Sequence, residues 1–97
     1  MLTKNQIIKT LEKHKPEIKT YGVKKLGVFG SFGKAKQNEK SDIDFLVEFD
    51  EPTFDKYMDL KFFLERLFKR KVDLVVEETL KPALQYVKEE AIYVKGV

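Results

Sequence analysis

Two apolar runs, joined by a Gly-Ser corner and a polar loop over residues 26–47, constrain this chain most strongly. The first run reaches the corner at Gly30 and Ser31, and the second run carries two aspartates, Asp42 and Asp44. Because alternate side chains of a strand point to the same face, Asp42 and Asp44 project together, roughly 6–7 Å apart. Two carboxylates on one face, beside a turn rich in backbone N–H groups, predict a site for a divalent cation and phosphate.

A third aspartate, Asp73, interrupts the apolar run of residues 72–76. An acidic side chain inside an apolar strand is unfavourable when it is buried without a partner, and a cation shared with Asp42 and Asp44 would remove that penalty. Gly-Ser alone is a common turn with a helix N-cap, and Asp-x-Asp alone is a common polar entry to a strand. Their combination is more specific, and it predicts three carboxylates that converge opposite the Gly-Ser corner.

Two other phosphate-binding motifs fail in this region. The glycines before Lys34 suggest a P-loop, but Val28 stands where the motif needs its first glycine. Ala35 stands where the P-loop needs Ser or Thr. A dinucleotide fingerprint needs two glycines two residues apart, whereas Gly27 and Gly30 are three apart. The corner is therefore interpreted as a Gly-Ser turn only.

Composition limits the chemistry that the chain can perform. The sequence has no cysteine and one histidine, which argues against disulfides, thiolate or multi-histidine metal sites and most nucleophilic triads. Lys and Arg total 19 against 16 for Asp and Glu, and this net charge of +3 is too small to indicate a nucleic-acid-binding protein. The basic cluster at residues 69–71 is interpreted as a solvated helix end that complements the helix dipole.

The length of 97 residues predicts a single domain over residues 1–97, with one core. Such a domain is short for an enzyme with several substrates, so a large acceptor has to be supplied from outside. No apolar run is long enough for a membrane span, and the N-terminus lacks a signal-peptide core. We therefore expect a cytoplasmic protein without membrane contact.

Hydrophobic periodicity predicts alternating helices and strands. We expect helices at residues 3–14, 15–22 and 54–69 and from residue 79 onward, a short helix after the corner, and strands at residues 23–29, 43–49, 72–76 and 91–94. This alternation favours an α/β or α+β fold, with helices packed on a small mixed sheet of three to four strands. Phe62 and Phe63 widen the apolar face of the long helix, which indicates either a generous core or a partner surface.

The corner, the paired aspartates and the later aspartate together resemble the nucleotidyltransferase superfamily that includes DNA polymerase beta. The matching residues are Gly30-Ser31, Ser41-Asp42-Ile43-Asp44 and Asp73. In its short length and in the sequence around these motifs, the chain is similar to the minimal nucleotidyltransferases, the MntA-type antitoxins that are paired with HEPN-domain toxins. The resemblance covers nearly the whole chain and implies the polymerase beta palm-like nucleotidyltransferase fold.

The resemblance implies a two-metal mechanism. Asp42 and Asp44 would hold two Mg²⁺ ions, and Asp73 would complete the metal site from the neighbouring strand. Coordination chemistry is consistent with this, because oxygen ligands suit a hard cation and two such ions can clamp the attacking and leaving oxygens of an in-line displacement. Asp73 would also accept the proton of the incoming hydroxyl.

The resemblance also implies nucleotide-binding roles. Gly30 would let the backbone approach the phosphates, and Ser31 and the helix N-terminus would donate hydrogen bonds to them. Ser41 would contribute to the same nucleotide site. Many relatives carry Arg-Gly after the first small residues, whereas this chain has Lys34 and Lys36 there, and a lysine cannot make a planar bidentate contact with a phosphate. Either lysine is a candidate to steady the leaving pyrophosphate.

The function implied is transfer of AMP from ATP to a tyrosine hydroxyl of a cognate HEPN toxin, in a hetero-oligomer with that toxin. Two alternatives stay open. One is a non-catalytic antitoxin that neutralises its partner by complex formation, with or without a bound nucleotide. The other is a nucleotidyltransferase that acts on a small molecule, although such relatives generally have an additional helical domain. Nucleic acid is not expected as a partner.

Overall fold

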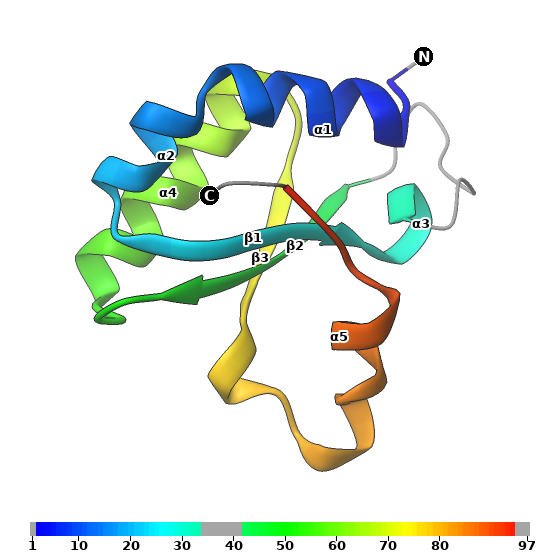
Figure 1. Cartoon of the computed structure of the whole chain (residues 1–97). Coiled ribbons are helices and arrows are strands. Elements are labelled where there is room, and N and C mark those ends of the chain that lie inside the picture. The colour runs from blue at the N-terminus through cyan, green and yellow to red at the C-terminus, as the bar shows by residue number, and fades with distance from the viewer. Residues whose placement is uncertain (1, 34–41, 95–97) are drawn as a thin grey trace.

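The protein, seen here as a computed structural model that describes residues 2–33 and 42–94, is built around one four-stranded sheet (Figure 1). The strand order is β3-β2-β1-β4, and the strands are β1 (Val23–Phe29), β2 (Ile43–Phe49), β3 (Val72–Val76) and β4 (Ile92–Tyr93). Strand β1 pairs antiparallel with β2 and β4, whereas β2 pairs parallel with β3. The predicted mixed sheet and its C-terminal edge strand are confirmed.

Helices cover one face of this sheet (Figure 1). They are α1 (Lys4–Lys13), α2 (Lys15–Thr20) and α4 (Phe54–Phe68), and a single turn, α3 (Gly30–Gly33), forms the corner after β1. On the other side lies a C-terminal arm made of η1 (Glu77–Thr79), η2 (Pro82–Leu84) and α5 (Tyr86–Glu90). We call this second side of the sheet the arm face. No helix among the described residues has the length and apolar character that crossing a membrane requires.

Local capping explains where the helices begin and end. Thr3 and Gln6 form a capping box, in which the Thr3 hydroxyl accepts from the Gln6 N–H at 3.2 Å and the Gln6 side chain accepts from the Thr3 N–H at 2.9 Å. Gly22 follows α2 with a left-handed φ of 75°. The Thr53 hydroxyl accepts from the Lys56 N–H at 3.2 Å and starts α4. These boundaries agree with the sequence prediction.

The core lies between the helices and the sheet. Alternate residues of β2 face the helices and are fully or almost fully buried, namely Ile43, Phe45, Val47 and Phe49. The residues between them, Asp44, Leu46 and Glu48, therefore face the arm. On α4, Phe63 is buried in the core, whereas the Phe62 side chain is 49% exposed. The widened apolar face of α4 is thus part core and part surface.

The fourth helix predicted from residue 79 is wrong. The Thr79 hydroxyl donates to the Val76 carbonyl at 2.8 Å instead of capping a helix, and the chain forms two 3₁₀ turns before α5. Lys81 is extended, with ψ at 153°, because a residue that precedes proline is disfavoured in the helical region and Pro82 follows. Leu80, Ala83, Leu84 and Val87 have the spacing of one helix face, but only Val87 is buried.

Candidate active site

The strand register brings the predicted carboxylates to one end of the arm face. Asp44 lies in the second position of β2, directly between Phe29 at the end of β1 and Asp73 in β3. Paired residues of neighbouring strands share a face, so the Asp44 and Asp73 side chains project to the same side. Asp42 immediately precedes β2, two residues before Asp44, and lies at the same end. The structure therefore places all three predicted acidic residues at one end of the arm face.

Electrostatics show that these carboxylates influence one another. Asp44 is half-buried, whereas Asp42 and Asp73 are exposed. Burial raises the pKa of Asp44 from its ordinary value of 3.8 to about 6, and the negative charges of Asp73 and then Asp42 contribute to the increase. A group with this pKa, placed in a cluster of like charges, is typical of a functional site that a cation would neutralise.

The Gly-Ser corner packs directly against this cluster. Gly30 has a left-handed φ of 69°, which favours glycine. A Cβ atom at this position would overlap the Oδ2 atom of Asp44 and lie 3.0 Å from its Cγ atom. Sequence reasoning assigned Gly30 to the phosphates, but it missed this second reason for glycine, since the approach of Asp44 depends on the β1–β2 register. The corner and the carboxylates thus form one contiguous surface.

The remaining predicted nucleotide-binding groups cannot be placed. Lys34, Lys36 and Ser41, together with the side chain of Ser31, lie outside what the structure describes. Their roles stay predictions.

The donor set fits Mg²⁺ in its chemistry. Carboxylate oxygens are the ligands that this hard cation prefers, and a bound cation would offset the burial and the like charges that raise the pKa of Asp44. Within residues 2–33 and 42–94, however, no three acidic or imidazole groups already lie close enough together to form a set of metal ligands. The cluster therefore offers suitable donors, whereas the ligand geometry is not preformed.

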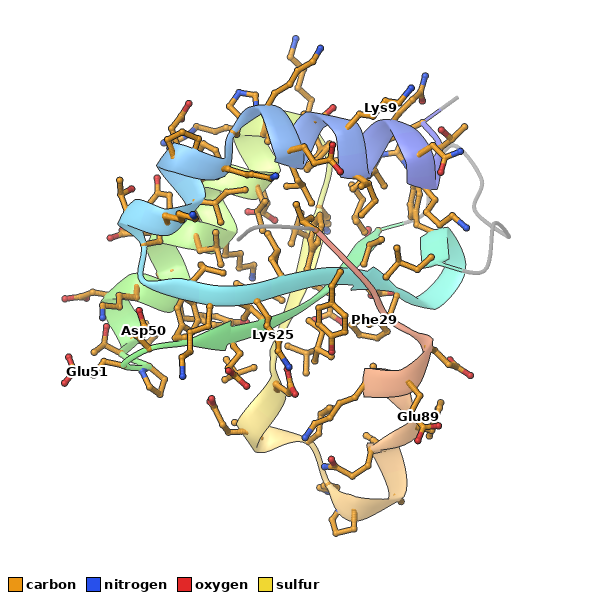
Figure 2. The ribbon with its side chains drawn as sticks, viewed as in Figure 1. Lys9, Lys25, Phe29, Asp50, Glu51 and Glu89 are labelled. Atoms are coloured by element: carbon orange, nitrogen blue, oxygen red, sulfur yellow. The ribbon has the colours of Figure 1, made fainter. Side chains whose placement is uncertain are left out.

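A second cluster, which sequence reasoning missed, occupies the far end of the arm face. Tyr93 of β4 lies over Gly27, where an added Cβ atom would be 3.0 Å from Cδ1 of the tyrosine ring. Burial raises the pKa of Tyr93, and the charges of Glu77 and Glu48 raise it further. The Lys25 ammonium lies 5.7 Å from the centre of the Tyr93 ring, and Figure 2 shows Lys25 on the side of the sheet where the arm lies. A glycine inside a strand, which often marks a close approach, was the available signal.

Glu77, the first residue of the arm, belongs to this second cluster. Its side chain is buried, and its Oε1 atom lies 3.6 Å from the ammonium of Lys88 on α5. Its Oε2 atom is buried and has no hydrogen-bond partner within the described part of the chain. A partly buried ion pair thus joins η1 and α5, the first and last segments of the arm.

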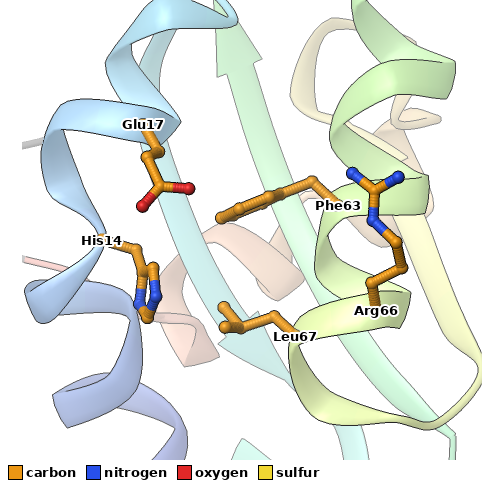
Figure 3. A pocket seen from close by; sticks show the side chains of 5 residues that line it. All are labelled: His14, Glu17, Phe63, Arg66 and Leu67. Atoms are coloured by element: carbon orange, nitrogen blue, oxygen red, sulfur yellow. The ribbon is translucent and has the colours of Figure 1, made fainter.

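A groove of about 350 Å³ lies on the helix-covered side, between the α1–α2 junction and α4 (Figure 3). Its lining residues are His14, Glu17, Phe63, Arg66 and Leu67. The His14 ring packs edge-on against Phe63 with ring centres 6.1 Å apart, and its Nδ1 atom lies 2.8 Å from the Thr10 carbonyl oxygen. These are contacts of an ordinary residue at the end of a helix. The groove lies on the opposite side of the sheet from the carboxylates and is no part of the candidate active site.

Sequence comparison identifies the family. Residues 6–94 match the family described as the nucleotidyltransferase domain. The chain is 40% identical to the protein adenylyltransferase MntA of Thermococcus cleftensis over 97 residues, which cover 97% of this chain and 98% of the relative.

Structural comparison gives the same result. A candidate minimal nucleotidyltransferase of known structure superimposes with a TM-score of 0.72 and 35% identity, over 88% of this chain and 93% of that one. A toxin–antitoxin crystal structure with AMP-PNP superimposes with a TM-score of 0.69 and 26% identity. That match covers 99% of this chain and 75% of the other. The predicted nucleotidyltransferase fold is confirmed.

Proposed function

The chain belongs to the nucleotidyltransferase domain family and, within it, to the MntA-type protein adenylyltransferases, and we propose that it transfers AMP from ATP to a tyrosine hydroxyl of a HEPN-domain toxin. It is an enzyme of the nucleotidyltransferase class. The toxin–antitoxin structure with AMP-PNP supports a nucleoside triphosphate donor and a toxin partner, because one chain of that structure resembles this chain over 99% of this chain's length. Mg²⁺ as cofactor and the tyrosine acceptor are part of the proposal.

One observation supports the proposal most directly. The β2–β3 register places Asp44 beside Asp73, and Gly30 packs against the Asp44 carboxylate from the other side. A nucleotide phosphate that approaches the Gly30 backbone would therefore also approach the carboxylates that suit Mg²⁺.

The three aspartates would have different roles in the reaction. Asp42 and Asp44 would hold Mg²⁺, which when bound stabilises negative charge on the reacting phosphates. The acceptor oxygen forms a bond to the α-phosphorus of ATP, the bond from that phosphorus to the bridging oxygen breaks, and pyrophosphate leaves with the electron pair. Asp73 is exposed, so a hydroxyl from another protein can reach it, and its carboxylate would accept the hydroxyl proton.

Radiolabelled ATP tests the proposal. The chain is incubated with Mg²⁺, ATP labelled at the α-phosphate, and the HEPN toxin encoded beside it, and we expect label on the toxin. A toxin variant with phenylalanine in place of the acceptor tyrosine should stay unlabelled. Absence of label on a toxin that forms a complex with the chain would refute the proposal.

A matched pair of variants identifies the site. Asp44→Asn should abolish labelling, whereas Asp50→Asn, the same change at the exposed residue that follows β2, should leave it unchanged.

A further inference from the structure

Arg70 lies at the same end of the sheet as the three carboxylates. The Ile43 N–H donates to the Lys71 carbonyl at 3.1 Å, and Ile43 pairs with Val72. The segment that leads into β3 therefore runs beside the start of β2. Arg70 immediately precedes this paired segment and stands three residues before Asp73. It is thus a cationic residue of the described chain at the edge where the acidic cluster lies.

The side chain of Arg70 reaches the Gly-Ser corner. Its guanidinium carbon lies 5.3 Å from the centre of the Phe32 ring. Phe32 belongs to α3, two residues after Gly30, and its side chain is fully buried. A cation over a fixed aromatic ring is attracted by the ring and held in place. The guanidinium is therefore positioned between β3 and the corner, with the ring of Phe32 as its support.

This position suits a group that binds phosphate. A triphosphate that enters this site is strongly anionic, and it approaches a cluster in which Asp44, Asp73 and Asp42 already repel one another. A guanidinium is always charged, and two of its parallel N–H groups match two oxygens of one phosphate. Because it carries five N–H donors, it can keep its existing contacts and still bind a phosphate.

From this geometry we propose that Arg70 makes a bidentate contact with the phosphates of ATP that leave as pyrophosphate. The inference rests on the proposed function in one respect, namely that the donor is a nucleoside triphosphate. When the bond between the α-phosphorus and the bridging oxygen breaks, the electron pair stays on the pyrophosphate, and Arg70 stabilises that charge without giving up a proton. For Arg70, this role goes beyond the sequence interpretation of residues 69–71 as a solvated helix end, which still fits the exposed Lys69 and Lys71.

Binding measurements test this role separately from catalysis. Isothermal titration of the full chain, in the presence of Mg²⁺, gives dissociation constants for AMP-PNP and for AMP. We expect Arg70→Gln to weaken AMP-PNP binding by roughly 10- to 100-fold, which is the loss typical of charge-assisted hydrogen bonds. AMP lacks the leaving phosphates, so its affinity should change by less than about threefold. Thermal unfolding shows whether the variant is folded.

Two further variants keep the test decisive. Arg66→Gln removes an exposed arginine from the last turn of α4, and both affinities should stay as in the unchanged protein. Arg70→Lys keeps the charge but not the planar fork, so AMP-PNP should bind several-fold more weakly while AMP does not. This conservative variant decides the question if Arg70→Gln does not fold.

The proposal is overturned if AMP-PNP and AMP affinities fall by the same factor, as they would if Arg70 only supported Phe32. It is also overturned if neither Arg70 variant changes AMP-PNP binding. Failure of the proposed function looks different, because the toxin would then stay unlabelled by the unchanged protein while AMP-PNP binding still depended on Arg70.

Discussion

Two acidic regions on the arm face differ in how their charge is balanced. At the far end, Glu77 is buried and the protein supplies its own cation, Lys88, at 3.6 Å. At the near end, Asp44 is less buried but lies beside Asp73, and its pKa is raised. Among the described residues, neither aspartate forms a salt bridge. The charge of the first region is thus balanced by a lysine of the fold, whereas in the second region the proposed Mg²⁺ would balance the charge.

Removal of one near-end carboxylate should have the largest effect. Asp44→Asn eliminates a proposed metal ligand, so we expect the rate of AMP transfer to fall by roughly 10²- to 10³-fold or more. The measurement is single-turnover transfer from labelled ATP, together with the affinity of the variant for its toxin. Full neutralisation of the toxin by the variant would favour the alternative of a non-catalytic antitoxin that acts by complex formation.

Substitution of Gly30 should have the next largest effect, and Gly22, a second glycine with a left-handed backbone, provides the comparison. Gly30 and Gly22 both have positive φ, so an alanine at either position should cost about 1–2 kcal/mol of unfolding free energy. Only Gly30→Ala also displaces the Asp44 carboxylate, and we expect it to lower transfer by roughly 10- to 100-fold. At Gly22 the added atom meets only the flexible end of Lys56. Equal activity of the two variants would show that the contact with Asp44 is irrelevant to catalysis.

Substitutions at the far end, where Lys88 balances the charge of Glu77, should lower the stability of the protein and have only a weak effect on AMP transfer. Lys88→Ala leaves the buried Glu77 carboxylate without its cation, and we expect a loss of about 1–2 kcal/mol, because the lysine side chain is 37% exposed. Urea denaturation measures this loss, and Lys81→Ala, at an exposed position of the arm, is the control. The double variant Glu77→Gln, Lys88→Ala should recover part of the stability, since no buried charge remains. If the double variant were less stable than the single one, the ion pair would not be the source of the effect.

The smallest effect should be that of Asp44 ionisation on the stability of the metal-free protein, and this effect should depend on pH. The pKa of Asp44 is raised from 3.8 to about 6 in the folded chain, so the folded state binds more protons than the unfolded state between these values. The stability of the metal-free protein should therefore fall as pH rises through this interval and stay low above it. After allowance for solvent screening, we expect Asp44→Asn to be more stable by about 1 kcal/mol near pH 7.5 and equally stable near pH 3.

Thermal unfolding in a chelator, at several pH values, measures this difference. Addition of Mg²⁺ should then stabilise the unchanged protein more than the variant. A difference that stays constant with pH would contradict the assignment of the effect to Asp44 ionisation.

Local signals made much of the fold predictable. The apolar run of β2 is followed directly by Asp50, Glu51 and Pro52, so the strand was predicted with its observed bounds. The helix expected from residue 79 failed because helical spacing of apolar residues competed with the effect of Pro82 on the residue before it, and the proline effect prevailed. Periodicity describes only which face a helix would bury, and it does not show that the helix forms.

The candidate site was predictable in its residue types but not in its contacts. Asp44 and Asp73 were unusual because they are acidic within apolar strands, and that anomaly is visible in the sequence. The packing of Gly30 against Asp44 and the support of Arg70 by Phe32 depend on strand register and on the turn at Lys69, which has a left-handed φ of 54°. A single sequence does not specify such pairings, because they arise between segments that are distant along the chain.

The parallel pairing of β2 with β3 has a consequence for the order in which the site matures during folding. Asp44 meets Phe29 through a short-range antiparallel pairing, but it meets Asp73 only after the chain has crossed over through α4. Long-range parallel pairing is slower than local closure. During refolding, the β1–β2 hairpin would therefore form first, and Asp73 would reach the other carboxylates last. The rate at which AMP transfer returns after dilution from denaturant would then report the rate at which β3 pairs with β2.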